Sequence, residues 1–307
     1  MRVLPPFLAV FRMTAAPHSV KADLLLLFAT FLAAAGWVFS KESLGGLLPL
    51  QFVGTRFLLA GVVLVAFSWG QLRGLDRRAL GRAAMVGVVF AVAMAFWILG
   101  LEHASHIGEG AFIASLGIVL VPVFARLFFG EHPPKATWVA LPVALAGFAC
   151  LSLAHGFRFE PGQWYFLVAA LLFSFLFNLN SRVVRGIPVL ALSAVQVSMV
   201  GVLILPASLL LEDWPASVPT PILFWLLASA IIATTLRFLV QLHGQSLTTP
   251  SHAAIILMLE PMWTALVAAW WFNESMTAMQ LLGCGLISLA LVMSRWQWIR
   301  GALKALF

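Results

Sequence analysis

One ionisable side chain lies deep inside an apolar segment of the chain. Glu260 lies nine residues into the run 251–272. At 1.5 Å per helical residue this is about 13 Å, close to the centre of a hydrocarbon core about 30 Å thick. A carboxylate at that depth is costly and generally faces a cavity or a partner. Since desolvation disfavours the ionised form, Glu260 is a candidate proton carrier. The alternative is a structural role, in which Glu260 caps or bonds a neighbouring helix.

Two arginines extend this candidate substrate site. Arg56 lies about 12 Å into the second apolar run, where it would bind an anionic substrate group or pair with a carboxylate such as Glu260. A fixed ion pair that only positions helices is an equally open interpretation. Arg237 lies nearer the end of its run, where a guanidinium can snorkel to the surface. Thr234, Arg237 and Gln241 nevertheless share one helical face, which is typical of a cavity lining.

Aromatic and amide side chains complete the candidate substrate-binding residues. Trp37, Trp97 and Trp263 are placed to reach a central cavity, where an indole can stack on a ring or hold a cation. Core packing is the competing interpretation for each tryptophan. Asn178 shares one side of the run 163–182 with two serines, so it either hydrogen-bonds a substrate or holds neighbouring helices together.

A cluster of histidines and carboxylates offers a different chemistry. On a continuous helix, the ionisable residues of the stretch 102–109 (EHASHIGE) would share a face, as in a membrane-embedded, metal-dependent enzyme. Gly108 favours a turn instead, so we expect a solvated rim with pH-sensitive histidines and no bound metal. No GxxxxGK[ST], HExxH or GxSxG sequence occurs, which argues against an ATP-driven pump, a protease or a lipase. We therefore expect no cofactor and no enzymatic activity.

The elements that position these residues are predicted to be membrane helices. The 307 residues are 62% hydrophobic and 9% charged, with a mean hydropathy of +1.03, whereas soluble domains are about 45–50% apolar and about 25% charged. Ten apolar runs are long enough to cross a bilayer, and none alternates with period two as a membrane barrel would. The sequence therefore predicts an all-α integral membrane protein with ten transmembrane helices. The runs are residues 22–41, 48–69, 82–102, 107–128, 136–154, 163–182, 189–211, 220–242, 251–272 and 278–296.

Basic residues predict the orientation of these spans. If the termini and every second loop lie on one side, that side carries thirteen of the eighteen lysines and arginines. The positive-inside rule then places both termini in the cytoplasm, as an even number of spans requires. Topology also explains the net charge of +7, so we expect a lipid bilayer rather than nucleic acid as the partner. Met1 and Met13 are both candidate start residues.

An internal repeat divides the chain. Shifting the sequence by 143 residues aligns residues 111–131 with residues 254–274 with six identities. We therefore predict two five-helix halves, residues 22–155 and 163–296, between cytoplasmic segments 1–21 and 297–307. Because five is an odd number, the second half would be inverted in the membrane. Inverted repeats are typical of secondary transporters, whose substrate site lies near the midplane between the halves.

Several short motifs, in this order and spacing, resemble the EamA-type members of the drug/metabolite transporter superfamily. The resemblance covers about residues 22–296. It implies a fold of two inverted five-helix halves and the efflux, less often the uptake, of small metabolites such as amino acids. The motifs are Gly36-Trp37, Arg56-Phe57-Leu58-Leu59-Ala60, Gly100-Leu101 to Ala104-Ser105, Leu127-Phe128-Phe129-Gly130-Glu131, Leu259-Glu260-Pro261, Phe272-Asn273-Glu274 and Gln280-Leu281-Leu282-Gly283.

Together these features predict a secondary transporter in the cytoplasmic membrane that exports amino acids or related amphipathic solutes by alternating access. Glu260 would set the cavity charge or couple transport to protons. Uptake or exchange of an anionic metabolite, such as a nucleotide derivative, is the alternative within transport. A metal-dependent membrane enzyme and a non-transporting assembly partner are alternatives of another class. A homodimer is a further possibility.

Overall fold

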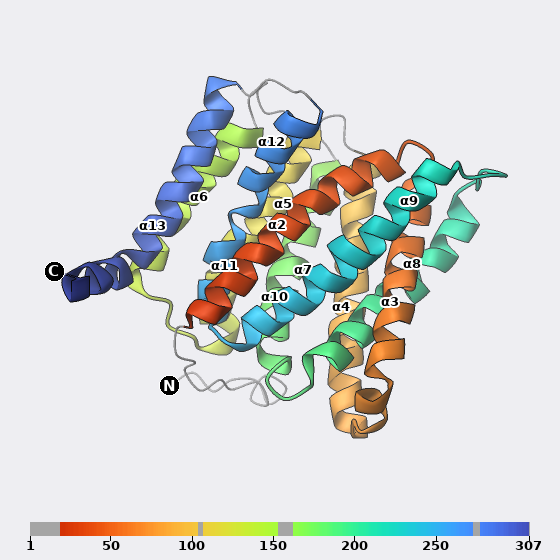
Figure 1. Cartoon of the computed structure of the whole chain (residues 1–307), viewed down its shortest axis with the longest axis horizontal. Coiled ribbons are helices and arrows are strands. Elements are labelled where there is room, and N and C mark those ends of the chain that lie inside the picture. The colour runs from red at the N-terminus through yellow and green to blue at the C-terminus, as the bar shows by residue number, and fades with distance from the viewer. Residues whose placement is uncertain (1–18, 104–106, 153–161, 273–276, 307) are drawn as a thin grey trace.

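The computed structural model describes residues 19–103, 107–152, 162–272 and 277–306, and this part of the chain is helical without strands. The prediction of an all-α protein is therefore confirmed. Figure 1 shows the helices packed side by side as a bundle, with α13 and α6 at one edge. The helices are α2 (Val20–Ser43), α3 (Pro49–Arg73), α4 (Arg77–Glu102), α5 (Ile107–Phe129), α6 (Lys135–Ser152), α7 (Gly162–Val183), α8 (Val189–Leu211), α9 (Thr220–Ala228), η1 (Ser229–Leu236), α10 (Arg237–Ser246), α11 (Pro250–Leu257), α12 (Glu260–Trp271) and α13 (Ala278–Leu306).

Seven helices within these residues are long and apolar enough to cross a bilayer, counting 220–246 and 250–271 as one helix each. Three shorter apolar helices lie at 113–129, 135–150 and 278–293. These helices make the chain a multi-pass membrane protein. The count of ten spans stays a prediction.

Local chemistry explains where individual helices begin and end. Asp76 caps α4 by accepting a hydrogen bond from the backbone nitrogen of Ala79 at 2.6 Å, so this helix begins before the apolar run that predicted it. Gly130 follows α5 with a φ of +66°, a backbone conformation that glycine adopts without strain. Helix α13 continues to Leu306, through most of the segment 297–307 that the sequence marked only as a tail.

A carboxylate from the second half of the chain caps a helix of the first half. Glu212, just after α8, accepts hydrogen bonds from the backbone nitrogens of Leu50 and Gln51 at 2.8 and 2.7 Å. These N–H groups at the start of α3 have no partner within their own helix, and the helix dipole favours a negative charge there. Ser208 donates to the same carboxylate at 2.7 Å and thereby holds it in place.

Helices α3 and α8 pack along each other at small residues. A Cβ atom at Gly201 would lie 2.5 Å from the backbone nitrogen of Leu58, and a Cβ atom at Gly54 would lie 2.8 Å from the Cα atom of Leu205. Glycine therefore permits the close approach of the two backbones, as is usual where membrane helices cross. Phe57, one residue from this contact, packs edge-to-face on Phe90 of α4 and extends the same core.

Two of the membrane helices are broken near their middles. The last helical residue of α11 is Leu257, and α12 begins at Glu260, because Pro261 has no N–H group to continue the hydrogen-bond ladder. In the other, π-helical turns (η1) separate α9 from α10. The hydroxyls of Thr234 and Thr235 donate to carbonyl oxygens five residues earlier, at 3.0 Å each. Each break is directly followed by an ionisable residue.

We predict that Gly201→Ala lowers the stability of the purified protein by about 1–3 kcal/mol, because the added methyl group forces α3 and α8 apart. Gly70→Ala on α3 is the matched control, since nothing lies within 4 Å of a Cβ atom there. Thermal unfolding in one detergent measures both variants. Equal melting temperatures would contradict the close contact.

Candidate functional site

The two helix breaks bring a cation and a carboxylate together inside the bundle. Arg237, the first residue of α10, donates from Nη2 to Oε2 of Glu260, the first residue of α12, at 3.1 Å. Glu260 lies at a helix N-terminus, where the helix dipole favours its negative charge. The Arg237 and Glu260 side chains are 23% and 21% exposed, so the pair is partly accessible. Glu260 thus has Arg237 as its partner, and Arg237 does not snorkel away from it.

Arg56 lies in a separate cluster between α2, α3 and η1. Its Nε donates to the hydroxyl of Thr234 at 2.6 Å, and its Nη1 donates to that of Ser40 at 3.2 Å. A third, longer bond of 3.4 Å reaches the carbonyl oxygen of Ala233. Among the described residues no carboxylate pairs with Arg56, and Arg237 acts on it as a like charge. The predicted pairing of Arg56 with Glu260 is therefore not the one observed.

Three polar atoms around the Arg237–Glu260 pair are buried without a hydrogen-bond partner. They are Nε of Arg237, Oε1 of Gln241 and the indole Nε1 of Trp263. Buried polar groups normally have partners, and exceptions are informative at functional sites. Gln241 lies one turn after Arg237, and Trp263 lies one turn after Glu260. The pair is thus bordered on both helices by groups able to hydrogen-bond a solute.

The other two predicted tryptophans, Trp37 and Trp97, lie on α2 and α4 and not on the helices that present this pair. Trp97 packs against the main hydrophobic core, and Trp37 is 41% exposed on α2. Trp263 meets the edge of Phe31 at a centroid distance of 6.4 Å. The surroundings of Trp97 therefore fit core packing, which was the alternative to a position in a substrate cavity.

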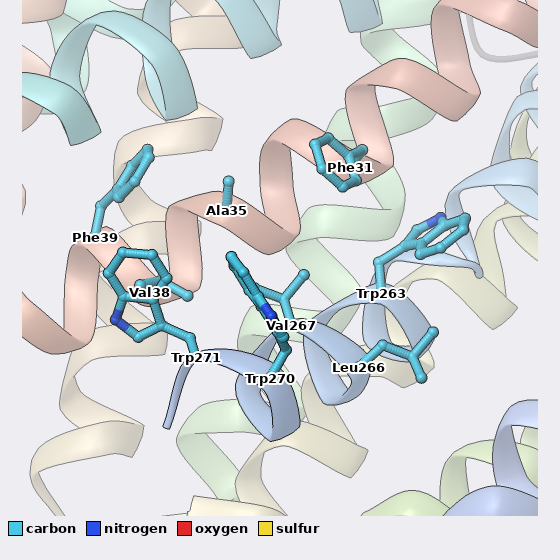
Figure 2. Close-up of a pocket in the computed structure, with 9 residues that line it drawn as sticks. All are labelled: Phe31, Ala35, Val38, Phe39, Trp263, Leu266, Val267, Trp270 and Trp271. Carbon is cyan, nitrogen blue, oxygen red and sulfur yellow. The ribbon is translucent and has the colours of Figure 1, made fainter. Parts of the chain in front are cut away.

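Trp263 also borders an apolar groove of about 370 Å³ between α2 and α12 (Figure 2). The groove contains no charged side chain, and Trp270 on its wall is 75% exposed. Such a surface suits lipid chains better than a polar solute. The candidate substrate site is therefore the surroundings of the Arg237–Glu260 pair rather than this groove. The groove is lined by Phe31, Ala35, Val38, Phe39, Trp263, Leu266, Val267, Trp270 and Trp271.

Asn178 lies where helices α5 and α7 touch, and it is fully buried. Its Nδ2 donates to the carbonyl oxygens of Val121 and Ser174 at 3.0 Å each, and its Oδ1 accepts from Arg182 at 3.1 Å. The hydrogen-bonding capacity of the amide is thus taken up by the protein. This arrangement fits the helix-joining interpretation of Asn178.

A buried ionic cluster that the sequence analysis did not single out lies at the end of α7. Arg182 is stacked over the ring of Phe129 at 3.9 Å, and its Nη2 lies 3.7 Å from Oε2 of Glu131. Ser251 of α11 donates to Oε1 of Glu131 at 2.9 Å. Burial raises the pKa of Glu131, although Ser251 and Arg182 oppose the shift, and burial lowers the pKa of Arg185 nearby. In the sequence, this cluster is indicated by a glutamate and an arginine at the ends of two apolar runs.

The stretch 102–109, which was expected to form a solvated rim, falls largely outside the described side chains. His103 is exposed, and its Nδ1 lies 2.9 Å from the carbonyl oxygen of Leu99. Among the residues that the structure describes, no group of three His, Cys, Asp or Glu side chains is placed to hold a metal ion. The side chains of Glu102, His106 and Glu109 are not described.

Charged side chains at broken helices of a multi-pass membrane protein are typical of transporters. The family model confirms this class. The chain belongs to the EamA-like transporter family, whose model matches residues 20–153 and again residues 160–296.

Known relatives agree with this assignment. The uncharacterized inner membrane transporter YedA of Escherichia coli K12 is 26% identical over 258 residues, covering 80% of this chain and 81% of YedA. An uncharacterized transporter of Archaeoglobus fulgidus is 27% identical over 271 residues, covering 88% of this chain and 84% of the relative. A crystal structure with 18% identity superimposes with a TM-score of 0.81 over 92% of this chain and 99% of the other, and it supports the fold.

We predict that Asn178→Ala destabilises the protein by about 1–3 kcal/mol, because it leaves buried groups of Val121 and Arg182 without their partner. Ser193→Ala is the control, since the Ser193 hydroxyl is buried without a partner and its loss should cost little. Thermal unfolding in detergent compares the two variants. An Asn178→Ala variant as stable as Ser193→Ala would argue against the helix-joining role.

Proposed function

We propose that this protein exports a small, carboxylate-bearing metabolite, such as an amino acid or a related amphipathic solute, by alternating access. The observation that carries the proposal is the partly exposed Arg237–Glu260 pair at two helix breaks, with Arg56 nearby. Charged groups inside a membrane bundle are costly and mark substrate or ion pathways. The two matches to the family model support ten spans in two inverted halves.

The chemistry of the site follows from its charges. A substrate carboxylate would bind Arg56 or Arg237, for which the planar guanidinium geometry is well suited. Glu260, released from Arg237, would then hold an ammonium group or take up a proton. Gln241 and the indole N–H of Trp263 would hydrogen-bond the remaining polar groups. Proton coupling through Glu260 is part of this proposal.

Basic residues near the helix connections indicate how the protein is oriented in the membrane. Arg73 and Arg77 flank the turn between α3 and α4, and Arg185 lies in the turn between α7 and α8. By the positive-inside rule these turns and both termini face the cytoplasm. Inner membrane relatives support a location in the cytoplasmic membrane.

Exchange or uptake of an anionic metabolite, such as a nucleotide derivative, is a second candidate function. It is favoured because Arg56 has no carboxylate partner among the described residues, while Glu260 balances Arg237. These three side chains carry one net positive charge in a medium of low dielectric constant. A solute with one net negative charge would neutralise them, whereas a zwitterion would not.

We predict that wild-type cells move one class of carboxylate-bearing metabolite outward and that cells with Glu260→Gln do not. Untargeted mass spectrometry of cells and medium measures this at matched expression. Arg73→Gln is the control, because Arg73 lies on the exposed end of α3 over Trp69 and should leave transport unchanged. Identical metabolites with wild-type and Glu260→Gln protein would contradict the role of Glu260.

Arg56→Gln should lower transport of that solute about tenfold or more, because a hydrogen bond to a charged group contributes about 1.5–3 kcal/mol. Arg56→Lys should retain part of the activity, since it keeps the charge but loses the planar geometry. Labelled solutes that differ only in net charge, tested in proteoliposomes, separate the two candidate functions. A site that prefers neutral zwitterions over monoanions would rule out the second.

A further inference from the structure

A compact apolar layer separates the Arg237–Glu260 pair from one end of the bundle. Leu26 of α2, Val121 of α5, Phe177 of α7 and Leu257 of α11 are buried in one cluster, which Val240 of α10 also joins. Leu257 and Val240 lie about one turn from Glu260 and Arg237, on the side of the α10–α11 turn. The layer thus contains helices from both halves of the chain.

The ionic cluster at the end of α7 lies beyond this layer. Glu131 contacts Arg182 of α7 and Ser251 of α11, so one carboxylate joins the end of α5 to two helices of the second half. Arg185 adds a bond of 2.8 Å to the carbonyl oxygen of Thr248, in the α10–α11 turn. Arg182 is almost fully buried, and a buried arginine without a carboxylate is strongly unfavourable.

A stripe of polar side chains runs through the same layers. Gln241 and Gln245 follow Arg237 at four-residue spacing on α10, and Thr248 lies just beyond the helix. Gln245 and Thr248 are fully buried, and both amide atoms of Gln245 and the hydroxyl of Thr248 lack hydrogen-bond partners. Such groups are costly in a permanently closed interior. They would be hydrated if this end of the bundle opened.

We infer that the Glu131–Arg182–Ser251 cluster is the cytoplasmic gate of this transporter, and that Gln241, Gln245 and Thr248 line the path which it closes. This rests on the proposed function, because a gate requires a transport path. The structure is then closed toward the cytoplasm, and the partly exposed Arg237–Glu260 pair is reached from the other side. Opening would hydrate Arg182, Glu131 and the α10 amides together.

Cysteine labelling tests the gate without any substrate. Gln245→Cys is introduced into a chain with Cys150 and Cys284 replaced by alanine, and inside-out vesicles are treated with a membrane-impermeant maleimide. We expect labelling much slower than for Gln71→Cys, an exposed position at the same end of the bundle. Adding Glu131→Gln should accelerate labelling about tenfold or more, because Arg182 loses its carboxylate and the open state gains population. Arg126→Gln, at an exposed arginine of α5, should leave the rate unchanged.

A double variant separates electrostatics from general damage. In Glu131→Gln with Arg182→Gln the almost fully buried guanidinium is removed together with its carboxylate, while Arg185 keeps its bond to the carbonyl oxygen of Thr248, so labelling should fall back toward the parent rate. Labelling of the parent as fast as Gln71→Cys would overturn the closed state. Equal rates for Glu131→Gln and Arg126→Gln would overturn the gate, as would a double variant that labels as fast as Glu131→Gln. Since no transport is measured, a failure here is distinct from a failure of the proposed exporter.

Discussion

The structure depends on one constraint, which is that a charge inside a lipid-embedded bundle requires polar partners, and Arg237 and Glu260 find theirs where their helices are locally irregular. Pro261 ends the hydrogen-bond ladder of α11, and Glu260 then begins a new helix with a dipole that favours its charge. The π-helical turns of η1 directly precede Arg237 and also offer the hydroxyl of Thr234 to Arg56. The two breaks place Arg237 and Glu260 within one ion pair. The irregular backbone of each helix therefore lies directly beside the charge that the helix contributes.

The fold was largely readable from the sequence because lipid permits so few structures. Apolar runs had to be helices, and the residues of the run 189–211 form α8 without a difference at either end. Helix ends set by a cap were not captured, as Asp76 extends α4 beyond its apolar run. The π-helical η1 was also missed, since no single residue type marks a change from four-residue to five-residue hydrogen bonding.

The candidate site was predictable only as a set of residues. Glu260, Arg56 and Arg237 stand out because charges are rare in apolar runs. Which of them pair depends on how helices far apart in the sequence are oriented about their axes when they pack. No residue pattern in the sequence specifies that orientation. The same reason explains why the Glu131–Arg182–Ser251 cluster was missed, since its members lie on α7, α11 and the end of α5 and look unremarkable at helix ends.

The Glu212 cap has a mechanical consequence. It fastens the start of α3 to the end of α8, while glycines allow the same two helices to touch backbone to backbone. Separating these helices would break charge-assisted hydrogen bonds and open a tightly packed seam at once. We therefore expect them to move as one rigid body, although α3 lies in the first match to the family model and α8 in the second. A rigid unit of this kind crosses the boundary between the two matches to the family model.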